Sequence, residues 1–292
     1  MTKRSRLRFS SWLLLTALGV GVPLPALAGV VNDVPSCYKA NHIEPVGGTA
    51  YDRLIYVLID QTVSWNSQLE HSLVNNLNRA LKPGTKFVVA EFSAFSQGRY
   101  LQVIHTGILE KPLTQAQDNN TAIPKVKAFK ACLRDQGTFA RNMADTTAVS
   151  VMKQSTSTLD QSDIMAAIKQ VSIAVRSDPA QDKVLLIASD GLENSSVTSF
   201  YGHGGVRDIN PGVEIKKAAA ADMFGDLGGA RVYFLGGALM PSANTGSLSA
   251  RNGYRDPQVL HNLSTFWREY FVKSNAKLME FGEPTLLVPI RF

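Results

Sequence analysis

Arg53-Leu-Ile-Tyr-Val-Leu-Ile59, followed at once by Asp60-Gln-Thr-Val-Ser64, is the stretch that decides the fold of this chain of 292 residues. A short, continuously apolar run rich in β-branched residues is typical of a strand that is buried on both faces. Large apolar residues then recur at fourfold spacing from Trp65 to Leu81, which predicts an amphipathic helix that ends at Pro83-Gly84. A buried strand that leads into such a helix predicts an α/β sheet covered by helices.

The same alternation of strand and helix continues toward the carboxyl end. Further buried strands are predicted at 86–92, 183–189 and 231–235, a more polar edge strand at 99–106, antiparallel to its neighbour, and a final strand near 284–290. Helices are predicted at 163–176, at 214–224 and after Asp256-Pro257, and the polar section 112–155 is also expected to be helical. We therefore expect one α/β domain, with a Rossmann-like, doubly wound, mostly parallel sheet, one antiparallel edge strand and helices on both faces.

The first 28 residues have the pattern of a secretory signal peptide. A basic start precedes an apolar segment at 12–22, and two prolines precede the small-x-small site Ala26-Leu27-Ala28. The apolar segment is about half of the roughly 20 residues that span a bilayer. Cleavage after Ala28 is the preferred interpretation, and an uncleaved amino-terminal anchor is the alternative. We expect a periplasmic or secreted protein without stable membrane insertion after cleavage.

The net charge of the chain comes mainly from this leader. The formal net charge is +6, but Lys3, Arg4, Arg6 and Arg8 lie within the first eight residues, and the rest of the chain holds 26 basic and 24 acidic residues. Proteins that bind DNA or RNA neutralise phosphates with clustered basic residues. The nearly balanced remainder argues against a nucleic-acid partner.

Two cysteines, Cys37 and Cys132, follow the leader. In an oxidising compartment, two cysteines with only each other as a partner favour a disulfide. Closing a loop of nearly a hundred residues would contribute about 4–5 kcal/mol in the chain-entropy relation. Two buried free thiols are the alternative. A catalytic cysteine is not indicated, because neither residue sits at a strand end near a histidine.

Oxygen-bearing side chains follow the predicted strands, where the loops of a doubly wound sheet collect ligands. The loops at 60–64 and 189–191 carry carboxylates and hydroxyls, and the segment before the helix at 163–176 adds another hydroxyl. Such oxygens suit hard divalent cations, and a site so short of ligands would complete its coordination with water or a partner's carboxylate. The candidate metal ligands are Asp60, Thr62, Ser64, Ser162 and Asp190.

These residues resemble the metal-ion-dependent adhesion site of the von Willebrand factor type A (vWA) domain. The first motif of that family, Asp-x-Ser-x-Ser, is matched by Asp60, Thr62 and Ser64, with threonine in place of the first serine. Its Thr-Asp-Gly motif is similar to Ser189-Asp190-Gly191. Ser162 stands where the family has a threonine ahead of a helix, without the preceding glycine.

The resemblance covers roughly residues 52–290 in element order. After the signal peptide at 1–28 and an N-terminal extension at 29–51, it implies a vWA-like domain at 52–292, with a helical insertion around 111–155. It also implies Mg²⁺ or Mn²⁺, with Ca²⁺ as a further candidate, bound to the hydroxyls directly or through water and to the negative charge of the two aspartates. A protein ligand offering an Asp or Glu carboxylate would then fill the open position on the ion.

Other interpretations of these motifs stay open at this point. Asp60 and Ser64 could merely cap the first helix, and Asp190-Gly191 could be an ordinary turn. Asp60 could also be the nucleophile of a metal-dependent envelope phosphatase, although Thr62 occupies the position where such an enzyme needs a general acid. A third alternative is a structural subunit with a vestigial metal site. We assign no catalytic residue, because no nucleophile elbow, phosphate loop or zinc motif is present.

The loop after Asp190 carries three further candidates. Phe200 and Tyr201 could anchor a partner or fold back onto the core. His203 is interpreted as a solvent-exposed residue on a glycine-rich loop.

Overall fold

The structure is a computed structural model that describes residues 32–93, 101–156, 161–202, 205–239 and 256–292. The chain separates into two units, Met1–Val30 and Val31–Phe292. The first unit, which contains the predicted signal peptide, lies outside the described residues. The elements are α1 (Cys37–Ala40), η1 (Val46–Gly48), β1 (Arg53–Asp60), α2 (Ser67–Ala80), β2 (Thr85–Phe92), β3 (Gln102–Leu109), α3 (Gln115–Asn120), α4 (Ile123–Gln154), α5 (Ile164–Ser177), β4 (Asp182–Ala188), β5 (Tyr201–Gly202), β6 (Gly205–Val206), α6 (Pro211–Ala220), β7 (Ala230–Leu235), α8 (Pro257–Lys273) and β8 (Ala276–Phe281).

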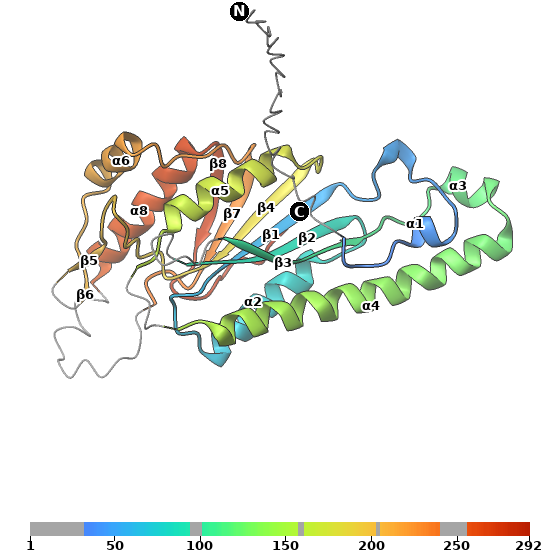
Figure 1. Cartoon of the computed structure of the whole chain (residues 1–292), viewed down its shortest axis with the longest axis horizontal. Coiled ribbons are helices and arrows are strands. Elements are labelled where there is room, and N and C mark those ends of the chain that lie inside the picture. The colour runs from blue at the N-terminus through green and yellow to red at the C-terminus, as the bar shows by residue number, and fades with distance from the viewer. Residues whose placement is uncertain (1–31, 94–100, 157–160, 203–204, 240–255) are drawn as a thin grey trace, which may run out of the picture. The chain divides into compact units, whose positions relative to one another are not determined.

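Six strands form one sheet in the order β3-β2-β1-β4-β7-β8 (Figure 1). The pairs along the sheet are parallel except the pair of β3 with β2, which is antiparallel. If the six strands of this sheet are renumbered in chain order, so that β7 and β8 become the fifth and sixth, the order is the 3-2-1-4-5-6 of doubly wound folds. The direction in which successive strands are added to the sheet reverses between β1 and β4. The predicted α/β class, with a mostly parallel sheet and one antiparallel edge strand, is confirmed. The arrangement is consistent with the vWA fold.

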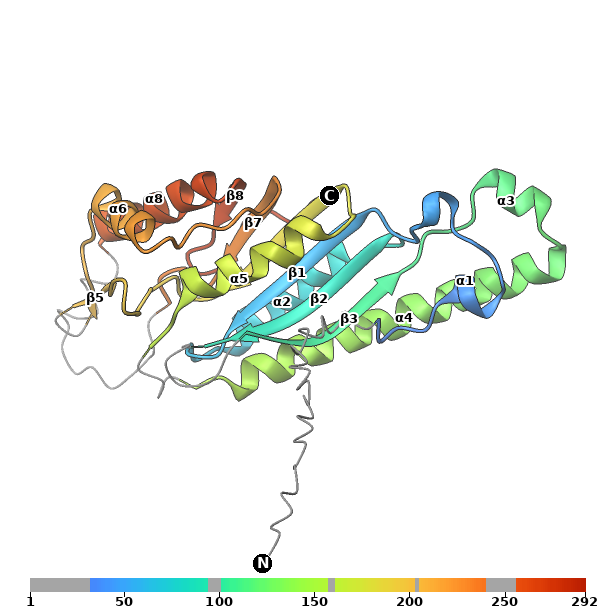
Figure 2. The ribbon, with the colours of Figure 1, turned by 45° about the horizontal axis from the view of Figure 1, so that its top comes forward.

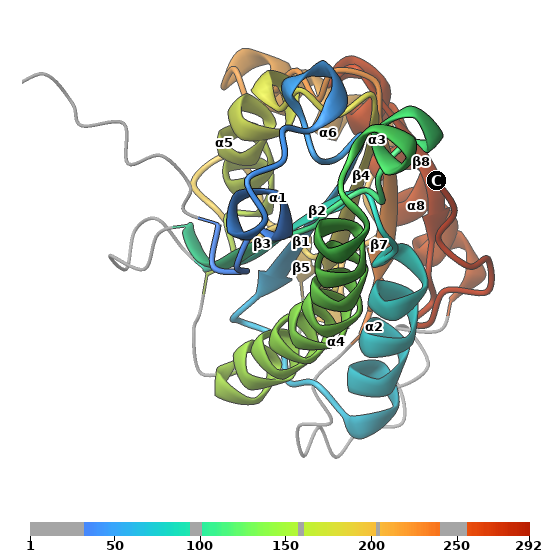
Figure 3. The same ribbon diagram turned by 90° about the vertical axis from the view of Figure 1, so that its right-hand side faces the viewer.

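Side chains of β1 alternate between two hydrophobic cores. One core lies under α5, α6 and α8, and the other lies under α2 and α4, as the end-on view in Figure 3 shows. Leu58 belongs to the first core and Ile59 to the second, and both are fully buried. Because both faces of the strand are covered, its sequence is apolar without interruption.

The section 112–155 forms α3 and the 32-residue helix α4. The C-terminal half of α4 packs on the sheet, and α1 and α3 lie beside its N-terminal half (Figure 2). A disulfide joins Cys37 of α1 to Cys132 of α4, with a Cα–Cα distance of 5.7 Å, so the predicted pairing is confirmed. We call residues 32–50 and 110–136 the arm. No helix of the described residues, α4 included, is long and apolar enough to cross a membrane.

The prediction of the final strand was wrong. The strand is β8, Ala276–Phe281, whereas residues 284–290 form no strand. Pro284 and Pro289 lack the N–H that a strand ladder requires. β8 is an edge strand whose residues are half-buried or exposed, so its sequence has no continuous apolar run to reveal it.

Candidate metal centre

The candidate residues lie at the carboxyl ends of β1 and β4, where the order of the sheet reverses. These two strands pair in parallel up to Ile59 and Ala188, and Asp60 and Ser189 follow these residues directly at the same edge of the sheet. Ser162 comes from a third segment, just before α5, and exchanges two backbone hydrogen bonds with Asn194 (3.1 and 3.0 Å). Three segments that are distant in the sequence therefore deliver oxygen atoms to one place.

The carboxylate of Asp60 is fully buried and accepts four hydrogen bonds. Its Oδ1 accepts the backbone N–H (2.9 Å) and the hydroxyl (2.6 Å) of Thr62. Its Oδ2 accepts the hydroxyls of Ser162 (3.1 Å) and Ser189 (2.7 Å). Each hydroxyl donates its proton to Asp60 and keeps lone pairs of its own. The geometry thus gathers three neutral oxygens around one buried carboxylate.

Asp190 is a second buried carboxylate beside the first. Its Oδ1 accepts the N–H of Leu192 (2.9 Å), as in an ordinary turn, and its Oδ2 accepts the phenol of Tyr201 (3.1 Å). Burial and the charge of Asp60 raise the pKa of Asp190 to about 8. Burial also raises the pKa of Asp60, against the lowering effect of its hydrogen bonds. Neither aspartate forms a salt bridge with a basic side chain in the described ranges.

This donor set fits a hard divalent cation. Carboxylate and hydroxyl oxygens are suitable ligands for Mg²⁺, which usually takes one or two carboxylates and keeps several waters. A cation would also offset the cost of ionising two buried carboxylates side by side. Within the described ranges, no three His, Cys, Asp or Glu side chains are grouped to hold a metal ion. A centre at this place would therefore depend on hydroxyls and water for its remaining ligands.

The loop that carries Thr62 is fixed by the C-terminal end of α4. The Nε2 of Gln61 donates to the carbonyl of Val151 (3.0 Å). The hydroxyl of Ser155 donates to the carbonyl of Val63 (2.7 Å). These two hydrogen bonds hold the backbone at Gln61 and Val63, on both sides of Thr62. The hydroxyl of Thr62 is therefore fixed in its position facing Asp60.

The alternative in which Asp60 and Ser64 cap the first helix was wrong. Helix α2 is capped by Asn66, whose Oδ1 accepts the N–H of Leu69 (2.9 Å). Ser64 is exposed and takes no part in the hydrogen bonds of Asp60. The structure therefore brings Asp60, Thr62 and Ser162 together and places Asp190 beside them, and it leaves Ser64 at the rim.

Two residues of this cluster were not among the candidate ligands. Ser189 had a signal in the sequence, because it directly precedes Asp190 in the third motif. Tyr201 was considered as a partner anchor, but its phenol binds Asp190. Phe200 folds back onto the core, with its ring centroid 4.9 Å from that of Phe266. His203 lies outside the described residues.

Glu193 was also missed, and it holds the start of α5 from the loop after β4. Its carboxylate is 1% exposed, and its Oε2 accepts the N–H of Met165 (3.0 Å). Asp163, the N-cap residue of α5, makes no capping hydrogen bond of its own. Burial raises the pKa of Glu193 to about 8. A cavity of about 300 Å³ has Gln161, Asp163 and Glu193 among its lining residues.

Comparisons with known proteins give distant likenesses only. No protein-family model matches the chain, and no curated protein matches it. An aerotolerance-related membrane protein from Bacteroides fragilis, solved with multiple mutations to serines, is 14% identical, with 79% of this chain and 92% of that chain covered and a TM-score of 0.34. The PilB minor pilin from Streptococcus sanguinis is 11% identical (81% and 58% covered, TM-score 0.35). The N-terminal domain of TFIIH p34 is 12% identical (75% and 98% covered, TM-score 0.26). The description of the fold therefore rests on the strand order and the layers themselves.

Proposed function

We propose that this chain is an exported, vWA-like protein-binding module that contacts its partner through a divalent cation. The ion, Mg²⁺ or Mn²⁺, would be held at the cluster of Asp60, Ser162 and Asp190, within an envelope-associated assembly. The observation that carries the proposal is the set of three hydroxyls, from three separate segments, that donate to the buried carboxylate of Asp60.

The residues of the cluster have complementary roles in this proposal. Asp60 orients the hydroxyls of Thr62, Ser162 and Ser189, because each of them donates its proton to this carboxylate and turns its lone pairs elsewhere. Asp60 and Asp190 supply the negative charge that balances the ion. Ser64 stays a proposed ligand, since its exposed hydroxyl is not engaged by Asp60.

An Asp or Glu carboxylate of the partner would fill the position on the ion that the chain leaves open. Mg²⁺ dehydrates reluctantly and is commonly shared between a protein and an oxygen ligand from outside. Tyr201, 36% exposed, and Ser64 lie on the accessible side of the cluster. They are the first residues that an approaching partner would meet.

Two further observations support this assignment. Asp60 is fully buried and accepts four hydrogen bonds, which suits a residue that orients ligands better than a nucleophile that must attack a phosphorus atom. The Cys37–Cys132 disulfide is of the kind that persists in oxidising compartments, which supports export.

Isothermal titration of the full chain with MgCl₂ and MnCl₂ tests the metal centre. We expect saturable binding, and we expect Asp60→Asn and Asp190→Asn to weaken it at least about tenfold, which corresponds to about 1.4 kcal/mol. Asp222→Asn is the matched control, because Asp222 is exposed and pairs with Lys169 away from the cluster. A wild-type titration without heat would refute the metal centre.

The partner is tested by metal-dependent capture. Proteins retained by the immobilised chain in Mg²⁺ and released by EDTA support the proposal. Retention that persists in EDTA and in the variant that lacks both Asp60 and Asp190 would favour a structural subunit with a vestigial site.

A further inference from the structure

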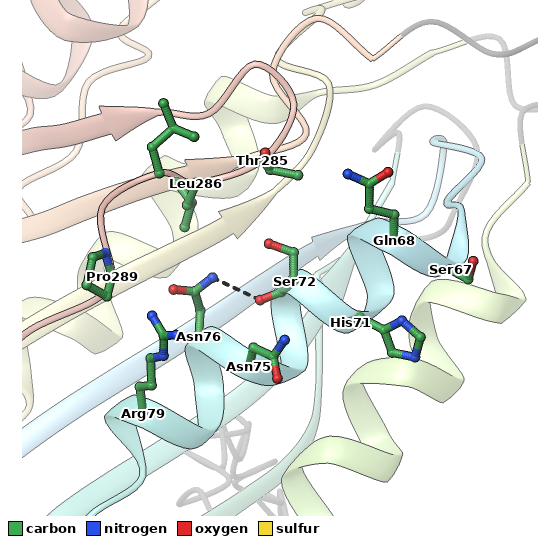
Figure 4. A pocket seen from close by; sticks show the side chains of 11 residues that line it. Ser67, Gln68, His71, Ser72, Asn75, Asn76, Arg79, Thr285, Leu286 and Pro289 are labelled. Atoms are coloured by element: carbon green, nitrogen blue, oxygen red, sulfur yellow. Dashed lines mark hydrogen bonds between the residues drawn. The ribbon is translucent and has the colours of Figure 1, made fainter.

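A polar groove runs between α2 and the C-terminal segment 285–289, and none of its lining residues is a candidate ligand of the metal centre. Its volume is about 550 Å³. One wall is a stripe of α2, and the other is formed by residues that follow β8 (Figure 4). The lining residues are Ser67, Gln68, His71, Ser72, Asn75, Asn76, Arg79, Thr285, Leu286, Leu287 and Pro289.

The stripe of α2 repeats hydrogen-bonding groups at every turn. Figure 4 shows Gln68, Ser72, Asn76 and Arg79 on the side of the helix that faces the C-terminal segment. Four helical residues rise about 6 Å, and two residues of an extended peptide rise about 6.6 Å. The spacing between successive turns of α2 is therefore close to the spacing between every second residue of an extended peptide. The stripe is about as long as five such peptide residues.

The side chains of the stripe suit a peptide backbone. A side-chain amide has both donors and an acceptor, as a peptide unit does. The Nδ2 of Asn76 donates to the carbonyl of Ser72 (2.9 Å), and Asn76, which is 7% exposed, keeps its Oδ1 as an acceptor in the lining of the groove. The side-chain amide of Gln68 makes no hydrogen bond within the described part of the chain, so its donors and its acceptor are all available.

The charge of the groove is positive. None of its eleven lining residues is acidic. Arg79 forms no salt bridge in the described ranges, whereas Lys86, Arg207 and Arg231 all pair with carboxylates. A free guanidinium at the end of the groove is complementary to a carboxylate.

The opposite wall is apolar and fixed in place. Leu287 is 86% exposed, and Leu286 and Pro289 lie beside it in the lining. The N–H groups of Leu287 and Val288 donate to the carboxylate of Glu280 (2.6 and 2.9 Å), and Ile290 is buried in the core. A wall anchored on both sides presents a stable surface for an apolar side chain of the ligand.

The geometry points to a second binding surface, at which this groove takes an extended, acidic peptide segment of a partner protein. Gln68 and Asn76 bind its backbone, Arg79 binds its carboxylate, and Leu286 and Leu287 contact an apolar side chain. Peptide binding at this surface requires no metal ion. The inference can therefore be tested independently of the proposed metal centre.

Selection from a displayed library of linear dodecapeptides on the immobilised full chain, in EDTA, tests this inference. EDTA silences the metal centre, so any enrichment reports another surface. We expect the enriched peptides to share an Asp or Glu beside an apolar residue. We expect Arg79→Glu to weaken a selected peptide at least about tenfold, because attraction becomes repulsion.

Lys82→Glu is the matched control, since it makes the same charge change at an exposed position near the end of α2 that does not line the groove. Both substitutions cost the helix end a similar fraction of a kcal/mol, and thermal unfolding checks that both variants fold. Equal binding by Arg79→Glu, or enrichment of peptides without acidic residues, overturns the inference. So does binding of an acidic oligosaccharide, such as a polygalacturonate fragment, in the absence of any enriched peptide.

Discussion

Asp60 and Glu110 are both buried carboxylates that accept four hydrogen bonds, at opposite ends of the sheet. Glu110 follows β3 and accepts from the hydroxyl of Ser36, the N–H groups of Cys37 and Tyr38, and the amide of Gln136. It thereby ties α1 to α4 next to the disulfide. Asp60 accepts from one N–H and three hydroxyls.

The difference lies in the donors and not in their number. An N–H that donates to a carboxylate has no lone pair left for a cation, whereas a hydroxyl that donates keeps its own. Glu110 has one hydroxyl donor, Ser36, and three N–H donors, which suits a role in holding the arm, whereas Asp60 has three hydroxyl donors, which suits the proposed ion site. The comparison thus sets a carboxylate that ties two helices together against one that we propose to serve a metal centre.

The largest expected effect is that of the disulfide on the arm. Replacing Cys37 and Cys132 by serine removes a cross-link between residues 95 apart in the sequence, which lowers the free energy of unfolding by about 4–5 kcal/mol in the chain-entropy relation. Denaturant unfolding measures the loss. Mg²⁺ affinity, measured by titration while the variant is folded, should stay unchanged. A parallel loss of affinity would contradict the separation of the two regions.

The second-largest expected effect is a dependence of the free energy of unfolding on pH. Burial raises the pKa values of Asp190 and Glu193 to about 8, so between their ordinary values and pH 8 the folded chain holds protons that the unfolded chain has released. Stability in EDTA should therefore fall by a few kcal/mol as the pH rises from about 5 to 8. Mg²⁺ should reduce this fall, because it binds the ionised aspartates, and Glu193 should account for the part that remains. Thermal unfolding at several pH values, with EDTA and with Mg²⁺, checks both statements; identical curves would speak against the metal centre.

The smallest expected effects are the changes in stability that result from neutralising Glu110 or Asp60. Glu110→Gln should lower the free energy of unfolding by about 2 kcal/mol, because charge-assisted hydrogen bonds are replaced by neutral ones, and should leave Mg²⁺ binding intact. Asp60→Asn should change stability in EDTA less than Glu110→Gln does, since it also removes the repulsion between the charge of Asp60 and the buried carboxylate of Asp190. Unfolding in EDTA, with the Mg²⁺ titration alongside, measures the contrast. The reverse order of stabilities would show that Asp60 is primarily structural.

Much of this architecture could be predicted from the sequence because a central parallel strand is apolar on both faces. The run of β1 and the motif that follows it located Asp60, Thr62 and the edge of the sheet on which they lie. The edge strand β3 was also predicted, but β8 has no continuous apolar run, so it was missed and the segment between Pro284 and Pro289 was taken for it. Periodicity describes one element at a time. Contacts between loops, such as Glu193 with the start of α5, depend on tertiary packing and left no trace in the spacing.

Helix α4 joins the two regions that the carboxylates distinguish. By the rise of 1.5 Å per residue, its 32 residues extend about 48 Å. Near one end it is cross-linked through Cys132, and at the other the carbonyl of Val151 and the hydroxyl of Ser155 hold the backbone around Thr62. One continuous helix thus carries the cross-link of the arm and the contacts that fix the backbone around Thr62.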